Sequence, residues 1–349
     1  MAQQAETLGV AVVGAGYWGP NLVRNFDAFE GTDLRWVCDL SRDRARKVVG
    51  GSRAAQVTDD LDQVLNDDSV DAVAIATPAG THASVALACL DAGKHVLVEK
   101  PLAASVAEGE KMVAAANERG LTLMCDHTYC YTPVVRRIRD LVADGEVGEI
   151  QYVDAVRINL GLVQRDIDVF WDLAPHDLSI LDFVLPLSRQ PLAVAATGAD
   201  PIRAGRACVG YLTLPLAGNA IAHAHVNWLS PTKVRTTIIG GSKRTIVWDD
   251  LHPYQRLSIH DRGVEVREGD DPSQIRERLV SYRIGDMVAP ALPEAEALGQ
   301  VVREFTAAIH ERRPAQTDGG SGLRVLRILE AASKSLESGG TPVELVDYR

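Results

Sequence analysis

The first 125 residues alternate short apolar runs with longer amphipathic stretches. The runs are apolar at nearly every position, which is typical of parallel strands that helices cover on both faces. Turn residues bound five such runs, at 8–13, 34–38, 70–76, 95–98 and 121–124. Helical stretches at 84–92 and 105–119 each end before a glycine, and the second opens with a capping box from Ser105 to Glu108. Strands that alternate with helices in this way predict a doubly wound parallel sheet.

After about residue 125 the pattern changes to successive strands. A helix is expected over 132–143, with Pro133 near its first turn. Strand-like segments follow at 151–160, 192–197, 207–214, 219–229, 234–239 and 244–248. Helical stretches at 294–310 and 322–338 close the chain. We therefore expect an α/β protein with two domains, residues 1–125 and residues 126–349. The second should be an α+β domain with a large, mostly antiparallel sheet that is open on one face.

Length, charge and cysteines narrow the class of protein. A chain of 349 residues exceeds what one hydrophobic core usually supports. Its 36 Lys+Arg against 47 Asp+Glu give a formal net charge of -11, which disfavours nucleic acid as a partner. The start lacks a signal-peptide pattern, and no apolar run approaches the ~20 residues that span a bilayer. Five scattered cysteines predict reduced, buried thiols. We expect a cytoplasmic protein with no membrane partner.

A glycine-rich turn follows the first predicted strand and leads into a helical stretch. Gly14-Ala-Gly16-Tyr-Trp-Gly19 has a spacing in which the first glycine permits a tight turn and the second lets a pyrophosphate approach the backbone. The third lets helix and strand pack closely, and the helix N-terminus offers N–H groups to phosphates. The turn predicts a Rossmann dinucleotide-binding domain, with a glycine turn of another α/β protein as the alternative.

The end of the second predicted strand bears on the choice of dinucleotide. Asp39 stands 20 residues after Gly19. A carboxylate there accepts hydrogen bonds from the ribose hydroxyls of NAD and repels the 2′-phosphate of NADP. Arg42 is close enough in sequence to accept such a phosphate. We expect NAD, with NADP open as the alternative.

Two further segments carry candidate chemistry. Glu99-Lys100-Pro101 ends a predicted strand, at the edge where ligands bind in open α/β sheets, and Pro101 keeps Lys100 out of a helix. Asp172 and His176 are four residues apart and share a face if their segment is helical. Imidazole accepts protons near neutral pH, and a carboxylate at that spacing can orient it or hold a substrate hydroxyl. The alternatives are a surface lysine, a helix-capping aspartate and an unrelated surface histidine.

Together with Ala76-Thr77-Pro78-Ala-Gly-Thr-His82, these motifs resemble the Gfo/Idh/MocA oxidoreductase family in order and spacing, over nearly the whole chain. The resemblance implies a Rossmann domain followed by an open-sheet domain. It also implies hydride exchange between NAD or NADP and a carbinol carbon of a sugar, inositol or nucleotide sugar.

The resemblance also implies roles for individual residues. Lys100 polarises the reacting oxygen, His176 exchanges the proton, and Asp172 supports substrate hydroxyls. The cofactor-binding residues would be Gly14, Gly16, Tyr17, Trp18, Gly19, Asp39, Arg42, Thr77, Pro78, His82, Glu99, Lys100 and His127. The substrate-binding residues would be Lys100, Tyr131, Arg157, Asn159, Arg165, Asp172 and His176.

One departure concerns the helix that would carry the catalytic histidine. Many members of the family read His-x-x-Asp, whereas Ser179 stands three residues after His176 in this chain. Acids stand instead at Asp177 and Asp182. The position of the carboxylate that supports this helix therefore stays open.

Three stretches in the middle of the chain look like those of members that act on nucleotide sugars. They are Asp126-His127-Thr-Tyr129-Cys-Tyr131, Arg157-Ile-Asn159-Leu-Gly and Trp228-Leu-Ser-Pro-Thr-Lys233-Val-Arg235. Some such members are thought to oxidise C3 of a nucleotide-linked hexose before an aminotransferase acts. On an acidic protein this ligand needs a local basic pocket, which we expect from Arg157, Arg165, Lys233 and Arg235. A solvent-facing strand is the alternative for Arg157, and an inter-subunit salt bridge for Lys233 and Arg235.

A predicted strand places His223, His225 and Asn227 on one face, opposite a run of small apolar residues. Two histidines at this spacing can begin a metal site, but no third ligand follows, so we expect a polar sheet face and no metal. A broad sheet with one uncovered face leaves an apolar patch unless it pairs with another subunit. We therefore expect a homodimer or homotetramer.

The sequence thus favours an NAD-dependent dehydrogenase that oxidises a secondary hydroxyl, at C3, of a sugar or nucleotide sugar, with an aminotransferase as a pathway partner. The alternatives are an NADP-dependent ketosugar reductase or an inositol-type dehydrogenase on the same scaffold, and a different Rossmann dehydrogenase. A non-catalytic regulator that senses dinucleotide and sugar is a further alternative.

Overall fold

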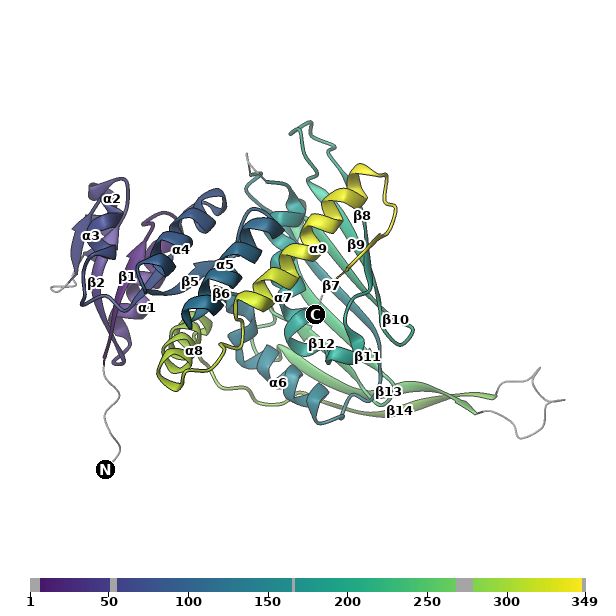
Figure 1. The fold of residues 1–349 in the computed structure, drawn as a ribbon. Coiled ribbons are helices and arrows are strands. Elements are labelled where there is room, and N and C mark those ends of the chain that lie inside the picture. Colours follow the sequence, from purple (N-terminus) through teal and green to yellow (C-terminus); the bar gives the residue numbers. More distant parts are fainter. Residues whose placement is uncertain (1–6, 51–54, 165–166, 268–278, 347–349) are drawn as a thin grey trace, which may run out of the picture. The chain divides into compact units, whose positions relative to one another are not determined.

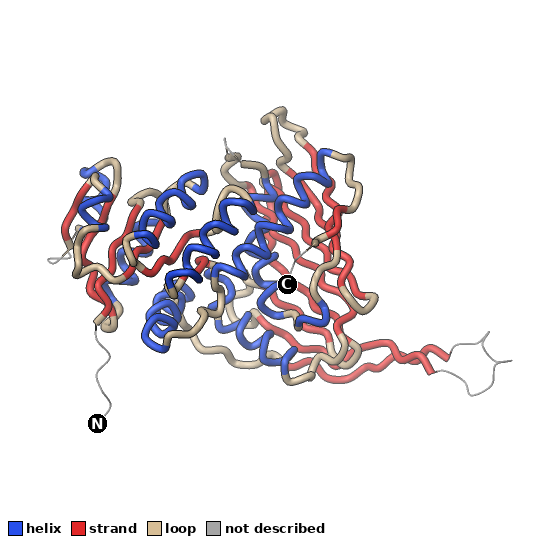
Figure 2. Tube along the Cα trace, viewed as in Figure 1, coloured by secondary structure: helices blue, strands red, loops and turns tan. Residues whose placement is uncertain are grey.

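The computed structural model describes residues 7–50, 55–164, 167–267 and 279–346. The chain divides into two compact units, Met1–Thr132 with Glu294–Glu330 and Pro133–Pro293 with Ala331–Arg349. In the first unit helices and strands alternate, and in the second strands predominate (Figure 2).

The first unit contains a six-stranded parallel sheet with the strand order β3-β2-β1-β4-β5-β6. Its strands are β1 (Leu8–Val13), β2 (Thr32–Cys38), β3 (Gln56–Thr58), β4 (Ala72–Ile75), β5 (His95–Glu99) and β6 (Leu123–Asp126). The order reverses between β1 and β4, and in such sheets ligands bind beyond the carboxyl ends of the strands at this point. The predicted doubly wound sheet is therefore confirmed, and the short strand β3 is added to it.

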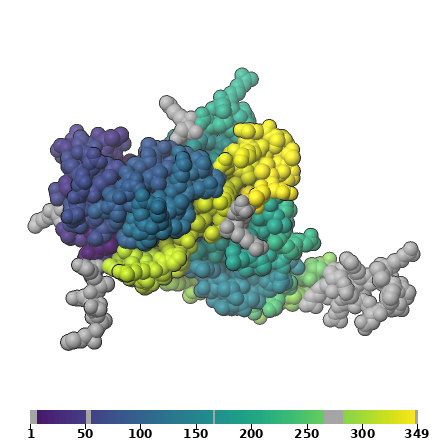
Figure 3. All heavy atoms as spheres, viewed as in Figure 1, coloured from purple at the N-terminus to yellow at the C-terminus, as the bar shows by residue number. Residues whose placement is uncertain are grey.

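Helices connect these strands and cover the sheet (Figure 1). They are α1 (Gly19–Ala28), α2 (Arg42–Val49), α3 (Leu61–Leu65), α4 (His82–Asp91) and α5 (Val106–Arg119), with short 3-10 turns at η1 (Ala79–Thr81) and η2 (Thr128–Tyr131). Helix α5 begins as predicted, because the Ser105 side chain accepts a hydrogen bond from the N–H of Glu108. It ends at Gly120, which adopts the left-handed conformation. In the space-filling view the residues of α4 and α5 form a continuous surface (Figure 3).

A segment from near the C-terminus belongs to the first unit, whereas the sequence placed all of 126–349 in a second domain. Helix α8 (Ala297–Glu311) buries an apolar stripe, and its Phe305 ring meets Phe26 of α1 edge-on, with ring centroids 6.5 Å apart. Arg24 and Glu296 form an ion pair beside this contact. Helix α9 (Gly319–Glu337) follows α8. The chain returns because α1 and α8 each expose an apolar face that the other covers.

The second unit is built on a nine-stranded sheet with the order β14-β13-β12-β11-β7-β10-β9-β8-β15. Its strands are β7 (Ile150–Leu160), β8 (Ala193–Ala199), β9 (Val209–Leu216), β10 (Ala220–Asn227), β11 (Leu229–Gly241), β12 (Thr245–Asp249), β13 (Leu257–Arg267), β14 (Leu279–Val288) and β15 (Val343–Glu344). β7 pairs parallel with β10 and antiparallel with β11, and the remaining pairs are antiparallel. The large, mostly antiparallel sheet is thus confirmed. Strands β13, β14 and β15 were not among the predicted segments, and β13 and β14 reach away from the rest of the sheet (Figure 1).

One face of this sheet is covered by α7 (Val169–Val184), which packs on β7, β9 and β10 and on α6 (Pro133–Ala143). A 3-10 turn, η3 (Leu187–Arg189), follows α7. Side chains alternate along β10: Ala222 and Ala224 are buried toward α7, and Ile221 on the opposite face is 47% exposed. Tyr152 and Tyr211 on the neighbouring strands are also exposed. Across the described part of the chain, no helix combines the length and apolar character that a membrane crossing requires.

Candidate active site

The glycine turn between β1 and α1 has the geometry of a dinucleotide site. Gly14 has φ +101, and a Cβ on it would lie 2.6 Å from the backbone of Ala76, so only glycine fits. A Cβ on Gly19 would lie 2.1 Å from the carbonyl oxygen of Gly14, which shows how closely α1 packs on the turn. At Gly16 a Cβ would meet no atom within 4 Å, which leaves the backbone open to a ligand.

No side chain caps the start of α1, and because Pro20 has no N–H and Asn21 donates to the carbonyl of Trp18, the N–H of Gly19 is the backbone donor that this end of the helix leaves for a ligand. Tyr17 beside the turn is 95% exposed, and Leu40 after β2 is 94% exposed. These two large side chains are thus open to solvent at positions next to the glycine turn and next to Asp39, where each can contact a ligand. The residues present therefore fit NAD.

The Asp39 carboxylate at the end of β2 organises the same turn. Its Oδ2 accepts a hydrogen bond from the N–H of Ala15 at 2.7 Å, and its Oδ1 accepts one from the N–H of Ser41 at 2.8 Å. Arg44 approaches Oδ1 at 3.3 Å. Arg42 instead donates to Asp59 at 2.8 Å. A carboxylate has about four acceptor positions, so Asp39 can hold the turn and still accept from a ribose hydroxyl.

Thr77 and Pro78 stand at the carboxyl end of β4, where the sequence expected cofactor contacts. The hydroxyl of Thr77 accepts a hydrogen bond from that of Thr81 at 2.8 Å. His82 is 1% exposed, and its two ring nitrogens lie 2.8 Å from the carbonyl oxygens of Pro101 and Thr77. The ring therefore joins the ends of β4 and β5, and a direct contact of His82 with the cofactor stays a prediction.

Two carboxyl groups lie side by side at the ends of β5 and β6. Glu99 and Asp126 are register partners on the adjacent strands. Burial raises the pKa of Glu99 well above its usual range, and the Asp126 charge raises it further. Burial also raises the pKa of Asp126, although the Thr128 hydroxyl donates to it at 2.7 Å. Both shifts have the direction expected for two buried carboxyl groups on adjacent strands, which disfavour full ionisation of each other.

His127 follows Asp126 and is 2% exposed. Neither of its ring nitrogens has a hydrogen-bond partner among the described residues. Burial lowers the pKa of His127 to about 3, and the positive charges of Lys100 and Arg324 lower it further. The ring is therefore neutral under physiological conditions. It remains a candidate cofactor contact, since a ligand at this edge would supply the missing partner.

Tyr131 was expected to bind substrate, and its position corrects that expectation. The side chain is fully buried, and its hydroxyl pairs with that of Thr317 at 2.9 Å. Thr317 in turn donates to the carbonyl of Cys125 at 2.8 Å. Tyr131 therefore joins the segment after β6 to the segment before α9, and it offers no polar group to a ligand.

In the second unit α7 carries the candidate acid–base pair. The segment is helical, so Asp172 and His176 share a face as the spacing predicted. Asp168 caps the helix, because its carboxylate accepts from the N–H groups of Phe170 and Trp171. The indole of the buried Trp228 donates to Oδ2 of Asp172 at 2.9 Å, which fixes the orientation of that carboxylate.

The carboxylate that supports this helix is Asp177. Its carboxylate accepts hydrogen bonds from Nε of Arg157 at 2.9 Å and from Nη2 at 2.8 Å. The side chains of this ion pair are 4% exposed for Arg157 and 6% for Asp177. Ser179, three residues after His176, donates to the carbonyl of His176 at 2.8 Å. Arg157 was expected to bind substrate directly. Its guanidinium is instead bound by the buried Asp177, so the contact that the structure shows for it is an internal one.

Of the four residues expected to form a basic pocket, the two arginines that the structure describes, Arg157 and Arg235, are paired with carboxylates. Arg235 is the register partner of Arg157, but it faces Asp250 at 3.5 Å. Lys233 is exposed on the same strand, and Arg165 lies outside the described residues. Arg157 and Arg235 thus each meet a carboxylate inside the unit, which lowers the local positive charge around them.

Asn159 is half-buried on β7. Its amide lies against Gly161, where a Cβ would be 2.8 Å from Nδ2. The same Cβ would be 3.4 Å from the ring of Trp228. Asn159 therefore borders the Trp228 contact that orients Asp172 and remains a candidate substrate ligand.

The histidines of β10 lie on the outer sheet face, as predicted. Tyr211 stacks on His225 with ring centroids 4.4 Å apart and on His223 at 5.9 Å. Burial lowers the pKa of His225, and His223 lowers it further. Among the residues that the structure describes, no group of three or more His, Cys, Asp or Glu is arranged to hold a metal ion.

Sequence reasoning missed Leu40, Arg44 and the role of Trp228 as the partner of Asp172. The position of Leu40 directly after Asp39 was the available sequence signal, and its exposure became known only with the structure. The Trp228 contact spans 56 residues of sequence and had no local signal.

Residues 8–127 match the model of the GFO_IDH_MocA oxidoreductase family with an NAD-binding Rossmann fold, and residues 135–247 match that of the GFO/IDH/MocA C-terminal domain. A UDP-N-acetylglucosamine 3-dehydrogenase of Acidithiobacillus ferrooxidans is 28% identical over 316 residues, 90% of this chain and 93% of that protein. The NADP(+)-dependent scyllo-inositol 2-dehydrogenase IolW of Bacillus subtilis is 24% identical over 348 residues, 95% of each chain.

Solved structures resemble this chain over nearly its full length. The structure of the Acidithiobacillus ferrooxidans enzyme, GnnA, superposes with a TM-score of 0.80 at 26% identity and covers 95% of this chain and 99% of its own. GenD2 from gentamicin A biosynthesis, in complex with NAD, gives a TM-score of 0.80 at 27% identity and covers 98% of this chain and 97% of its own.

Proposed function

We propose a specific reaction on the premise that this chain belongs to the Gfo/Idh/MocA family of NAD(P)-dependent oxidoreductases. It oxidises a secondary hydroxyl, at C3, of a hexose that is free or linked to a nucleotide. The observation that carries the proposal is α7, which presents Asp172 and His176 on one face and holds Asp172 by Trp228. A non-catalytic dinucleotide sensor has no need of a carboxylate fixed four residues from an imidazole.

The cofactor side of the proposal rests on the first unit. Gly14, Gly16 and the uncapped start of α1 would hold the phosphates, and Asp39 the adenosine ribose. When bound, NAD supplies the hydride acceptor for the carbinol carbon. We propose NAD over NADP because Asp39 adds negative charge where a 2′-phosphate would lie, and because Arg42 is held by Asp59.

The residues of this chain handle the proton and the developing charge. The imidazole of His176 removes the hydroxyl proton while the hydrogen on the same carbon leaves as hydride. The ammonium of Lys100 stabilises the negative charge that builds on the oxygen, which is the kind of contribution that often dominates barrier lowering. Asp172, with its orientation set by Trp228, accepts a hydrogen bond from a substrate hydroxyl. Lys100 and His176 lie in different units, and their convergence on one sugar is part of the proposal.

The choice of a sugar follows from the relatives, which include a UDP-N-acetylglucosamine 3-dehydrogenase and an inositol dehydrogenase. A panel of nucleotide sugars, free hexoses and cyclitols with NAD+ and NADP+, read at the NADH absorbance, tests it. An aminotransferase added to the assay would withdraw an unstable keto product. Turnover of cyclitols alone, or with NADP+ alone, would contradict the proposal.

The catalytic roles are tested by single substitutions. Lys100→Ala and His176→Ala should each lower kcat by about 10²–10⁴-fold, the usual contribution of general acid–base or electrostatic groups. Asp39→Asn keeps the size of the side chain but can accept only one of the two backbone hydrogen bonds that Asp39 receives, and as a control outside the acid–base pair it should change the KM for NAD+ more than kcat. If either catalytic variant keeps kcat within a few-fold of the wild type, the assignment is wrong.

We also propose that the protein is a cytoplasmic homodimer or homotetramer that associates through the outer face of the nine-stranded sheet. All five cysteines are free and buried, which suits a reducing compartment. Tyr152, Tyr211 and Ile221 on that face are 36–47% exposed, which favours an interface. Light scattering at micromolar concentration tests the state. A monomeric mass, or an oligomer that survives Tyr211→Glu with Ile221→Glu, would refute it.

A further inference from the structure

Helix α7 carries a proline directly before His176. Pro175 has no N–H, so the carbonyl of Trp171, one turn earlier, lacks its usual intrahelical donor, and the proline ring crowds that turn. Helices commonly kink at such a position. The direction in which His176 points therefore depends on contacts between α7 and the sheet as well as on the helix itself.

Two contacts with the sheet side of the unit lie on either side of Pro175. On the amino side, Asp172 accepts the indole N–H of Trp228 at 2.9 Å. On the carboxyl side, Asp177 receives the guanidinium of Arg157 through two hydrogen bonds of 2.8 and 2.9 Å. The second contact begins at the residue next to His176, so it constrains the backbone from which the imidazole projects.

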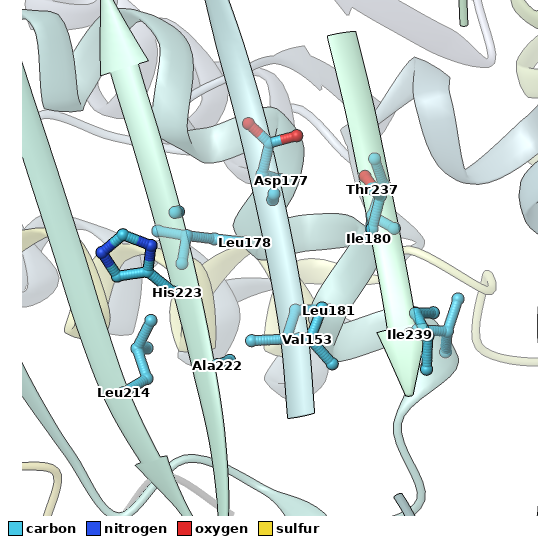
Figure 4. Close-up of a pocket in the computed structure, with 13 residues that line it drawn as sticks. Val153, Asp177, Leu178, Ile180, Leu181, Leu214, Ala222, His223, Thr237 and Ile239 are labelled. Atoms are coloured by element: carbon cyan, nitrogen blue, oxygen red, sulfur yellow. The ribbon is translucent and has the colours of Figure 1, made fainter. Parts of the chain in front are cut away.

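Most of the residues that line the cavity beside Asp177 are apolar, which makes a charged pair an unusual choice for stability alone. A cavity of about 20 Å³ lies between α7 and the sheet, and Asp177 and Thr237 carry the carboxylate and hydroxyl oxygens among its labelled lining residues (Figure 4). Other lining residues are Val153, Leu178, Leu181 and Ile239. Apolar residues of similar volume often replace a buried ion pair without loss of stability. A bidentate arginine–carboxylate pair adds a fixed distance and plane, which apolar packing does not.

We propose that the Arg157–Asp177 ion pair positions His176 for proton transfer, by fixing the rotation of α7 at the turn that Pro175 weakens. The inference rests on the proposed function, in which His176 is the proton acceptor. Arg157 and Asp177 are positioning residues: they act through His176 and do not touch the substrate. Asp177, held by Arg157, is then the carboxylate that supports this helix, whose position the sequence left open.

The test removes the pair without leaving a buried charge. Arg157→Met with Asp177→Leu replaces both charges by apolar side chains, and the adjoining cavity gives the leucine room. We expect Tm and the KM for NAD+ to stay near their wild-type values and kcat to fall by about 10²-fold, the effect of misplacing a catalytic group by about 1 Å. Arg157→Lys keeps the positive charge but loses the planar guanidinium that donates two hydrogen bonds to Asp177, and it should lower kcat with little change in Tm.

A control breaks another bidentate arginine–carboxylate pair, in the first unit, whose carboxylate is buried and whose arginine is 36% exposed. Glu304 is 7% exposed, and its carboxylate accepts two hydrogen bonds from the guanidinium of Arg313, at 2.6 and 3.0 Å. Glu304→Gln should lower Tm and leave kcat unchanged, so that loss of stability and loss of positioning are separated.

The comparison with His176→Ala distinguishes this inference from the proposed function. If His176→Ala loses activity while both Arg157 variants keep wild-type kcat, the ion pair is structural and the positioning role is overturned. If His176→Ala itself keeps wild-type kcat, the proposed function fails and the positioning role fails with it. A fall in kcat in the Arg157 variants, at unchanged Tm and unchanged KM for NAD+, supports the inference. If the double variant does not fold, the kcat of Arg157→Lys alone decides between a positioning and a structural role of the ion pair.

Discussion

The buried His127 makes a quantitative prediction about acid stability. Its pKa is lowered from 6.5 to about 3 by burial and by the charges of Lys100 and Arg324. Below pH 6.5 the unfolded chain binds a proton at this position and the folded chain does not, so stability falls as the pH falls. One pKa unit corresponds to 1.36 kcal/mol. Between pH 7 and pH 5 this histidine should therefore remove about 2 kcal/mol of unfolding free energy.

Two variants isolate that contribution. His127→Gln keeps a polar side chain but cannot titrate, so its stability relative to the wild type should rise by about 2 kcal/mol between pH 7 and pH 5. His127→Leu should show the same pH response. It should also gain about 1–3 kcal/mol at pH 7, because it removes a buried polar group that has no partner among the described residues.

The measurement is urea unfolding at pH 7 and pH 5, followed by tryptophan fluorescence without added cofactor, with free energies taken from the midpoints at a common m value. Glu99 and Asp126 have raised pKa values, and raised carboxyl pKa values cost stability as the pH rises, which opposes the histidine. Comparing variant with wild type removes the part of this effect that both proteins share. A difference between His127→Gln and wild type that is the same at both pH values would refute the reasoning.

Three further predictions concern the first unit. Gly16→Val should raise the KM for NAD+ at least tenfold with little change in Tm, because its side chain enters space that is open in the fold; an unchanged KM in steady-state kinetics would contradict this. Asp39→Ala should loosen the turn and lower the preference for NAD+ over NADP+, measured as the ratio of the two kcat/KM values; an unaltered ratio would count against it. Phe305→Ala should lower the free energy of unfolding by about 3–5 kcal/mol, because it removes the ring that packs on Phe26. Chemical denaturation measures this, and a decrease below about 1 kcal/mol would mean that neighbouring side chains fill the space.

Predictions that depended on neighbours in sequence succeeded. The capping box at Ser105 and the glycine turn at Gly14 involve atoms a few residues apart, and local backbone geometry decides them. The shared face of Asp172 and His176 likewise followed once the segment was helical. The short elements β3 and α3 were not predicted, because three to five residues carry too little periodic signal.

Predictions that depended on the identity of a distant partner failed or stayed incomplete. Tyr131 is separated by 186 residues from the threonine that holds its hydroxyl. Arg157 reads as a substrate ligand until Asp177 is seen beside it. For His82, the sequence did not show that its ring lies between the carbonyl groups of Pro101 and Thr77. In each case a polar residue near a recognised motif serves the fold, because a buried polar group must be satisfied by whatever the tertiary structure brings near it.

The sequence by itself determined the class of this protein: a doubly wound domain with a glycine turn, a second domain with a broad sheet, and a helix with an acid and an imidazole on one face. These features repeat at the periods of strand and helix, or lie within one turn, so they are encoded locally. The tertiary structure decided that α8 joins the first unit, and that Arg157 and Tyr131 are internal supports. Such choices depend on the burial of charge and apolar surface between segments far apart in the chain, which no local pattern records.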